Sequence, residues 1–332
     1  MTTQLRPLSL GEILDRTTQL YRANFLTFAG IAAVPTILIL LATIPLLGTA
    51  GLMGVYGRAA AAANGPFLAG VMAGGTVFGI VLLVATVFSQ AALVRAVTGA
   101  HTGRPLAVRQ ALGSVKPRFW RYLGVLLLQG ILIGVVPAVV AGVVIGIVFA
   151  LTHASGGDAG ANVIAGIVSF FIAAATFVII ILRGLSYSLA MPACIAEEKP
   201  AWESLQRSKK LSHGARGRIF LMFLLIWVLA MVVSMGGYIA MLIVMAVAAL
   251  VNKGGHMGTS VIVAGEVVNM LVNLSIQTVI TPVYVTALVL FYYDQRIRTE
   301  GYDIEWMMEH AGLTGSQPEI AGTAPDAGTL NG

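Results

Sequence analysis

Polar side chains form one continuous stripe in the last apolar segment of the chain, residues 261–293. They follow one another at steps of three or four, the spacing of a single helix face: Glu266, Asn269, Asn273, Gln277, Thr281 and Tyr284. Polar groups at membrane depth must face protein or water. The stripe therefore predicts either a cleft for a headgroup, an ion or a proton, or a set of hydrogen bonds that join neighbouring helices.

Arg183 is a second candidate, because it lies within an apolar segment. We expect its long side chain to reach the inner headgroup level and to hold a lipid phosphate there together with Tyr187. Pairing with Glu266 is not expected, since helical rise separates the two residues by roughly 22 Å in depth. Further basic residues near the ends of apolar segments are candidates for the same headgroup contact: Arg16, Arg22 and Arg207.

The sequence offers no set of residues typical of catalysis or of metal binding. Its five histidines stand without partners at metal-ligand spacing, and its single cysteine, Cys194, cannot form an intramolecular disulfide. No nucleophile with an adjacent base and no phosphate-binding loop is found. We therefore expect a protein that is not an enzyme and that uses no cofactor and no metal.

The apolar content of the chain determines the elements that must position these residues. Hydrophobic residues make up 58% of the 332 residues and charged residues 10%, whereas a soluble domain carries about 25% charged residues. An apolar run of about 20 residues crosses a bilayer as a helix. Six runs predict an all-α, polytopic membrane protein with six transmembrane helices, at 25–47, 67–97, 119–151, 162–194, 217–250 and 261–293.

Basic residues gather on one side of the predicted membrane. Eighteen of the 20 Lys and Arg residues fall at the N-terminus, after the second and fourth apolar segments, and after the sixth; only Arg58 and Lys253 lie in the other loops. This bias predicts that both termini are cytoplasmic and that anionic lipid headgroups are the partners. Nucleic-acid binding is not expected, because the basic residues flank helix ends instead of forming a folded domain.

One pattern recurs three times along the chain. Pro7, Pro105 and Pro200, spaced by 98 and 95 residues, each open a basic amphipathic segment that runs into two apolar segments. The pattern predicts three repeated helical hairpins within one membrane domain, 1–310. The repeat units are about 5–100, 101–195 and 196–310, and a disordered cytoplasmic tail follows at 311–332.

The amphipathic segments are clearest in the first unit. Ser9 and Glu12 form a capping-box pattern that predicts a helix start, and apolar residues then follow at helical spacing. We expect each segment to form a cytoplasmic helix that lies at the membrane interface. The alternative, which is compatible with the first, is an elbow that orients the hairpin after it.

Three stretches carry a resemblance to a known family. They are LRPLSLGEILDRTTQLYRANF at 5–25, ACIAEEKPAWESLQRSKKLSHGARGRIF at 193–220 and FYYDQRIRTEGYDIEWM at 291–307. Together they resemble the bacterial glycerophosphoryl diester phosphodiesterase membrane-domain family. The resemblance implies a module of the bacterial inner membrane near glycerolipid metabolism. It carries over no catalytic residue, because the separate catalytic barrel of such proteins and its His-Arg-Gly motif are absent from this sequence.

These observations favour a non-catalytic integral membrane module that binds lipid or a membrane-protein partner at the inner leaflet. The alternative function is a transporter or channel that uses the polar stripe. A membrane enzyme acting on lipid phosphodiesters is a third class, which the missing acid–base pairs make the least favoured. The sequence indicates neither the ligand nor the oligomeric state.

Overall fold

The computed structural model describes residues 8–56, 65–251 and 259–301, and all regular structure in these ranges is helical. The long helices are α2 (Phe25–Tyr56), α4 (Gly65–His101), α8 (Ala159–Tyr187), α11 (Arg216–Val251) and α12 (Thr259–Glu300). Three segments form one continuous helical stretch, α6 (Phe119–Gly130), the π-helical turn η2 (Ile131–Val135) and α7 (Val136–Ala154). The short helices are α1 (Leu10–Ala23), α5 (Val108–Val115), the 3₁₀ turn η1 (Lys116–Arg118), α9 (Ala190–Ala196) and α10 (Ala201–Ser212).

The helices have the length and composition of membrane spans. Five of them in the described part of the chain are long and apolar enough to cross a membrane, and a sixth is added if α1 and α2, which meet at 87°, count as one span. The all-α, multi-pass membrane class predicted from the apolar runs is therefore confirmed. The tail at 311–332 lies outside the described residues.

The helix bounds follow the apolar runs with three differences: α2 continues to Tyr56, α12 continues to Glu300, and the fourth run is divided between α8 and α9. A loop was expected from residue 48, but the helix continues to Tyr56. Residues 48–56 contain no proline and no charge, so nothing in this stretch interrupts the backbone hydrogen bonding of the helix. Composition predicts the existence of an element better than its last turn.

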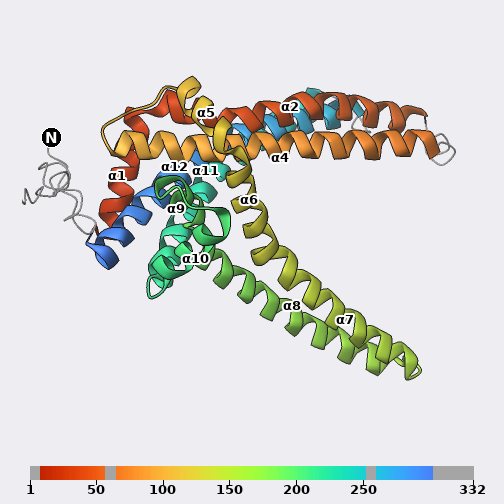
Figure 1. Ribbon diagram of the computed structural model, residues 1–332. Coiled ribbons are helices and arrows are strands. Elements are labelled where there is room, and N and C mark those ends of the chain that lie inside the picture. Colours follow the sequence, from red (N-terminus) through yellow and green to blue (C-terminus); the bar gives the residue numbers. More distant parts are fainter. Residues whose placement is uncertain (1–7, 57–64, 252–258, 302–332) are drawn as a thin grey trace, which may run out of the picture.

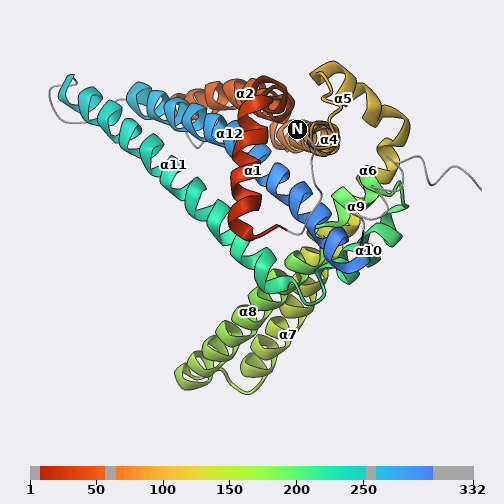
Figure 2. The same cartoon turned by 90° about the vertical axis from the view of Figure 1, so that its left-hand side faces the viewer.

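The long helices form three pairs that are consecutive in sequence, α2 with α4, α7 with α8, and α11 with α12. The first and last pairs lie together, because α2 also packs along α12. Figures 1 and 2 show the pair α7–α8 pointing away from α2 and α4. We call the pairs arms, and the short helices α1, α5, α9 and α10 at their common end the base. The repeat relation between the three units stays a prediction.

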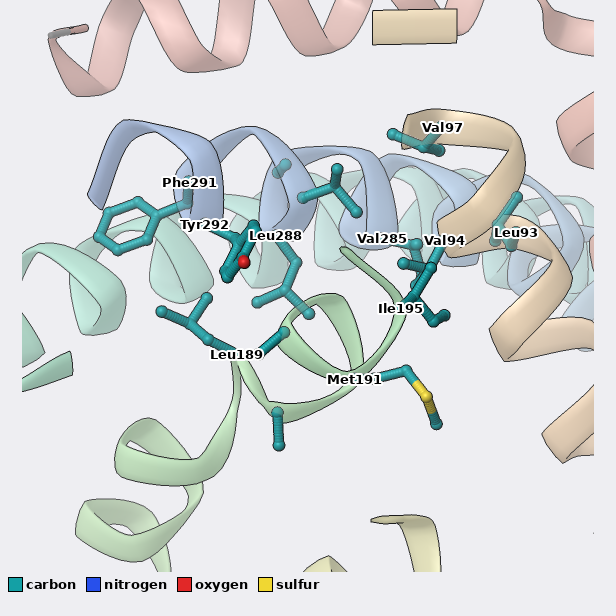
Figure 3. Close-up of a cluster of buried hydrophobic side chains, with 14 of the residues drawn as sticks. Leu93, Val94, Val97, Leu189, Met191, Ile195, Val285, Leu288, Phe291 and Tyr292 are labelled. Atoms are coloured by element: carbon teal, nitrogen blue, oxygen red, sulfur yellow. The ribbon is translucent and has the colours of Figure 1, made fainter. Parts of the chain in front are cut away.

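The hydrophobic core lies where the base meets α4 and α12 (Figure 3). Leu93 of α4, Met191 of α9 and Leu288 and Tyr292 of α12 are all buried there. By contrast, the side chains along α7 and α8 are mostly exposed, including Phe170 and Phe171. The protein is therefore closely packed at the base, and the arms present the apolar surface that a bilayer would cover.

The first amphipathic segment forms a helix as predicted, but its apolar face is covered by protein. Ser9 caps α1 and both hydrogen bonds of the capping box with Glu12 are present. Ile13 and Thr17 on the apolar face are buried, and α1 packs against α12. Protein therefore covers this face of α1, and the position of the helix at the membrane interface stays a prediction. The elbow interpretation fits its 87° turn into α2.

A buried carboxylate ties the start of the chain to the base. The side chain of Asp294 in α12 is fully buried and accepts a hydrogen bond of 2.7 Å from the Leu8 backbone N–H. Arg298 and Arg218 pair with the same carboxylate at 2.9 and 3.2 Å. Both arginines also donate to the Leu8 carbonyl oxygen. The four groups satisfy one another and fix α1 against α11 and α12.

Candidate functional site

A cavity of about 770 Å³ lies where the arms leave the base. We call it the junction cavity. Residues of α4, α6, η2, α8, α9, α11 and α12 line it, and most of their side chains are apolar, such as Leu126, Ile133, Phe223 and Trp227. The other lining side chains with polar groups are uncharged: Gln90, Gln129, Ser188 and Tyr284. A volume of this size lies within the roughly 300–1,000 Å³ typical of pockets for small molecules.

The polar stripe of α12 leads into this cavity at one end. Tyr284 lines the cavity, and its ring contacts that of Phe223 on α11 with centroids 5.5 Å apart. Asn273 and Gln277 are exposed, whereas Asn269 and Thr281 are half-buried. The side chain of Glu266 lies outside the described residues. The stripe thus runs from exposed positions of α12 toward the junction cavity.

The asparagines of the stripe do not join helices to one another. The amide of Asn273 donates to the carbonyl oxygen and to the side-chain oxygen of Asn269, at 2.9 and 2.8 Å, both within α12. The contact to α2 is made from a neighbouring face, where the Thr278 hydroxyl meets that of Thr36 at 3.3 Å. Interhelical hydrogen bonding is therefore not the role of Asn269 and Asn273.

Arg183 is placed differently from the expectation. Its guanidinium donates to the carbonyl oxygen of Leu132 at 2.9 Å, across the α7–α8 arm. In η2 the Val136 N–H bonds to the Ile131 carbonyl, five residues back. In the same register the Leu132 carbonyl would need an N–H from residue 137, which is a proline and has none. Arg183 supplies the missing donor.

Arg207 is also placed differently, because acidic side chains surround it. Its guanidinium pairs with Glu197 at 2.7 Å and with Glu300. These two carboxylates raise the pKa of Arg207 against the opposing effect of its partial burial. The charge of Arg207 is thus paired within the base, and the lipid-headgroup contact expected for it stays a prediction.

The remaining predicted headgroup contacts have separate surroundings. Arg22, in the last turn of α1, is exposed, and Arg16 is half-buried. Tyr187 is half-buried at the end of α8, where its backbone carbonyl accepts from Gln129 at 2.6 Å. The neighbouring carbonyl of Ser186 accepts from the hydroxyls of Ser208 and Ser212. The backbone carbonyls at the end of α8 are thus hydrogen-bonded within the protein. The headgroup contacts of Arg16 and Arg22 stay predictions.

Three polar residues of the junction cavity were not among the predicted site residues: Gln90, Gln129 and Ser188. The two glutamines are isolated polar side chains in apolar segments, which is itself a signal of function at membrane depth. Gln129 has no polar neighbour at helical spacing and Gln90 has only Thr86, so no stripe marks them. Only the packing of separate helices brings them to one cavity with Tyr284.

The described residues do not bring together three or more His, Cys, Asp or Glu side chains in a group suited to a metal ion. Cys194 is buried, and its thiol faces the Lys199 carbonyl at 3.4 Å. The groups that line the junction cavity offer apolar contact along its walls and hydrogen bonding at a few fixed positions.

Fold and site together define a multi-pass helical membrane protein with an uncharged cavity at the junction of its helices. The chain belongs to the family described as a domain of unknown function, DUF8558, whose model matches residues 71–286, more than half of the chain. Neither the curated proteins nor the solved structures give a match. The family carries no activity with it, so the resemblance to the phosphodiesterase membrane domains stays a prediction.

Proposed function

We propose that the protein is a non-catalytic module of the bacterial inner membrane that binds a lipid in the junction cavity. The observation that carries this proposal is the division of the cavity wall into a large apolar part and a few uncharged polar groups. A lipid has the same division between its chains and its polar end. The cavity adjoins the base, which the distribution of Lys and Arg predicts to be cytoplasmic, so the lipid comes from the inner leaflet.

The proposed topology has six spans, with α1 and α2 together forming the first, and both termini in the cytoplasm. It is supported by the side-by-side contacts of α2 with α4, α7 with α8 and α11 with α12. The three repeats each contribute one arm in this proposal. The junction cavity then lies where all three repeats meet, because its lining includes residues from every arm.

Native mass spectrometry of protein released from its own membranes tests lipid binding. Gly130 lines the cavity, and a Cβ added there would meet only open space, so Gly130→Leu adds bulk at the cavity wall. Gly142 in α7 is exposed and equally open, which makes Gly142→Leu the matched control. We expect one bound lipid in the wild type and in Gly142→Leu, and its loss in Gly130→Leu. A folded wild type without lipid would contradict the proposal.

Transport is the second candidate, and one observation favours it. Asn273 and Gln277 are exposed on the stripe that ends at Tyr284, which would give a polar path from exposed positions of α12 to the cavity. Proteoliposomes loaded with a pH-sensitive dye test this for protons. Transport predicts a proton flux that Asn273→Leu or Glu266→Gln abolishes while the protein stays folded. An impermeable wild type would exclude proton transport.

A further inference from the structure

Two polar side chains in the junction cavity have no hydrogen-bond partner in the described part of the chain. They are the amide of Gln90 on α4 and the hydroxyl of Tyr284 on α12, both half-buried. The other polar groups are occupied, since Gln129 donates to the Tyr187 carbonyl and Ser188 to the Leu185 carbonyl. Unpaired polar groups at this depth are costly, so a ligand that pairs with Gln90 and Tyr284 is favoured.

Charged residues near the cavity along its helices are turned away from it. Arg218 precedes the cavity-lining Phe220 by two residues on α11 and pairs with Asp294. Arg183 follows the cavity-lining Ile181 by two residues, which places it on nearly the opposite face of α8, where it bonds to Leu132. Arg95 lies well over one turn beyond Gln90 on α4 and donates to the Tyr122 hydroxyl at 2.9 Å. A charged headgroup in the cavity would find no opposite charge, and burying an unpaired charge is strongly unfavourable.

We infer that the lipid bound in the junction cavity is an uncharged one, with hydroxyl and ester groups as its only polar part, of the diacylglycerol class. This inference rests on the proposed function. The Gln90 amide both donates and accepts, and so does the Tyr284 hydroxyl, which matches a free hydroxyl and an ester carbonyl. The acyl chains lie against the apolar walls, including Ile133, Leu224 and Trp227.

Quenching of tryptophan fluorescence by brominated lipids tests the inference, because Trp227 lines the cavity. Trp120, Trp202 and Trp306 are replaced by Phe, so that Trp227 is the only emitter. The protein is reconstituted in phosphatidylethanolamine vesicles that contain either brominated diacylglycerol or brominated phosphatidylglycerol. A second protein keeps only Trp120, which is exposed on α6, and reports contact with the surrounding bilayer.

We expect brominated diacylglycerol to quench Trp227 at about a tenfold lower mole fraction than brominated phosphatidylglycerol, because the charge of phosphatidylglycerol stays unpaired in the cavity. Trp120 should show no such preference. The double variant Gln90→Leu, Tyr284→Phe should raise the mole fraction of brominated diacylglycerol needed to quench Trp227 by about tenfold, the loss of two neutral hydrogen bonds of ordinary net strength, while the protein keeps its melting temperature in detergent.

Each contrary result has its own meaning. Both lipids could quench Trp227 more strongly than Trp120, and to the same extent. That result would overturn the inference that the bound lipid is uncharged, while lipid binding in the cavity would stand. Quenching of Trp227 that matches Trp120 with both lipids would overturn the proposed function itself. Quenching of Trp227 by brominated diacylglycerol at an unchanged mole fraction in the double variant would overturn the assignment of Gln90 and Tyr284 as the recognising groups.

Discussion

Glu197 shows how the charged residues of the base neutralise one another. Burial alone would raise the pKa of Glu197, but hydrogen bonds from Lys199, Arg207 and Tyr292 and the nearby charge of Arg207 outweigh it and hold the pKa below its ordinary value. The Tyr292 hydroxyl donates at 2.8 Å and Lys199 approaches within 2.7 Å. The folded state therefore favours the ionised carboxylate.

The lowered pKa of Glu197 predicts a dependence of stability on pH. The ionised carboxylate stabilises the fold fully above its unfolded pKa of about 4.5, and this contribution is lost as the pH falls through the lower folded value. We expect Glu197→Gln to lower the melting temperature in detergent by a few degrees at pH 7 and to flatten its decline below pH 4.5. Glu203→Gln, at an exposed position of α10, is the control. An unchanged acid slope in Glu197→Gln would contradict this role.

Single residues of the site differ in how well the sequence predicts them. Tyr284 was predicted, because it belongs to a stripe with helical period. The ion pairs of Arg207 were not predicted, since a sequence shows a charge but not its partners, and Glu300 lies 93 residues further on. Gln90 could have been suspected as an isolated polar residue, yet nothing in the sequence places it beside Tyr284.

The helical stretch from α6 to α7 depends on a bond from outside it. Arg183 donates to the Leu132 carbonyl, whose backbone donor is missing at Pro137. We expect Arg183→Leu to destabilise the protein by about 1–3 kcal/mol, the cost of an unsatisfied buried carbonyl. Pro137→Ala restores an N–H at residue 137, so the same substitution should cost much less in that background.

A double-mutant cycle measured by reversible unfolding in mixed micelles gives this coupling directly. If Arg183→Leu lowers the free energy of unfolding equally with and without Pro137→Ala, Arg183 does not compensate for the N–H that is missing at Pro137. That result would also restore the lipid-phosphate contact as the better explanation for Arg183. The π-helical turn itself could not be predicted, because its register depends on this tertiary bond.

Two adjacent glycines in α11, Gly236 and Gly237, differ in how closely α12 approaches them. A side-chain carbon on Gly237 would lie 2.5 Å from the Val272 Cγ1 atom of α12, whereas Gly236 has open space. We expect Gly237→Ala to cost about 1–3 kcal/mol through overpacking and Gly236→Ala to be close to neutral. Unfolding of both variants under the same conditions measures the difference. Equal effects would mean that α11 and α12 do not approach closely there.

At the scale of the whole molecule, the membrane class and the helices were predictable, and the cavity was not. Long apolar runs define helices one at a time, because each run satisfies its own backbone in lipid. Helix α1 was also predictable, because its capping box is a signal within a few consecutive residues. The directions of the arms and the packing of α12 over α1 could not be predicted. Both depend on contacts between residues far apart in sequence, which a local sequence pattern does not indicate.

The basic residues show the same difference between what the sequence predicts and what depends on the fold. Their bias toward one set of loops is a property of the sequence and predicts the orientation of the protein. Their partners are a property of the fold. Arg118 forms a bidentate pair with Glu198, and Arg218 and Arg298 hold Asp294. Several charges that were expected to meet lipid headgroups instead hold the base together.

Mapping of photo-crosslinked lipid tests most directly whether the junction cavity is a lipid site. The protein is reconstituted with lipids that carry a photoreactive group in the acyl chain, irradiated, digested and sequenced by mass spectrometry. We predict adducts on cavity residues such as Leu126 and Phe223, lost in Gly130→Leu but kept in Gly142→Leu, with adducts on the exposed Phe170 of α8 unchanged in all. The absence of adducts on Leu126 and Phe223 in the wild type, or their persistence in Gly130→Leu, would contradict the account.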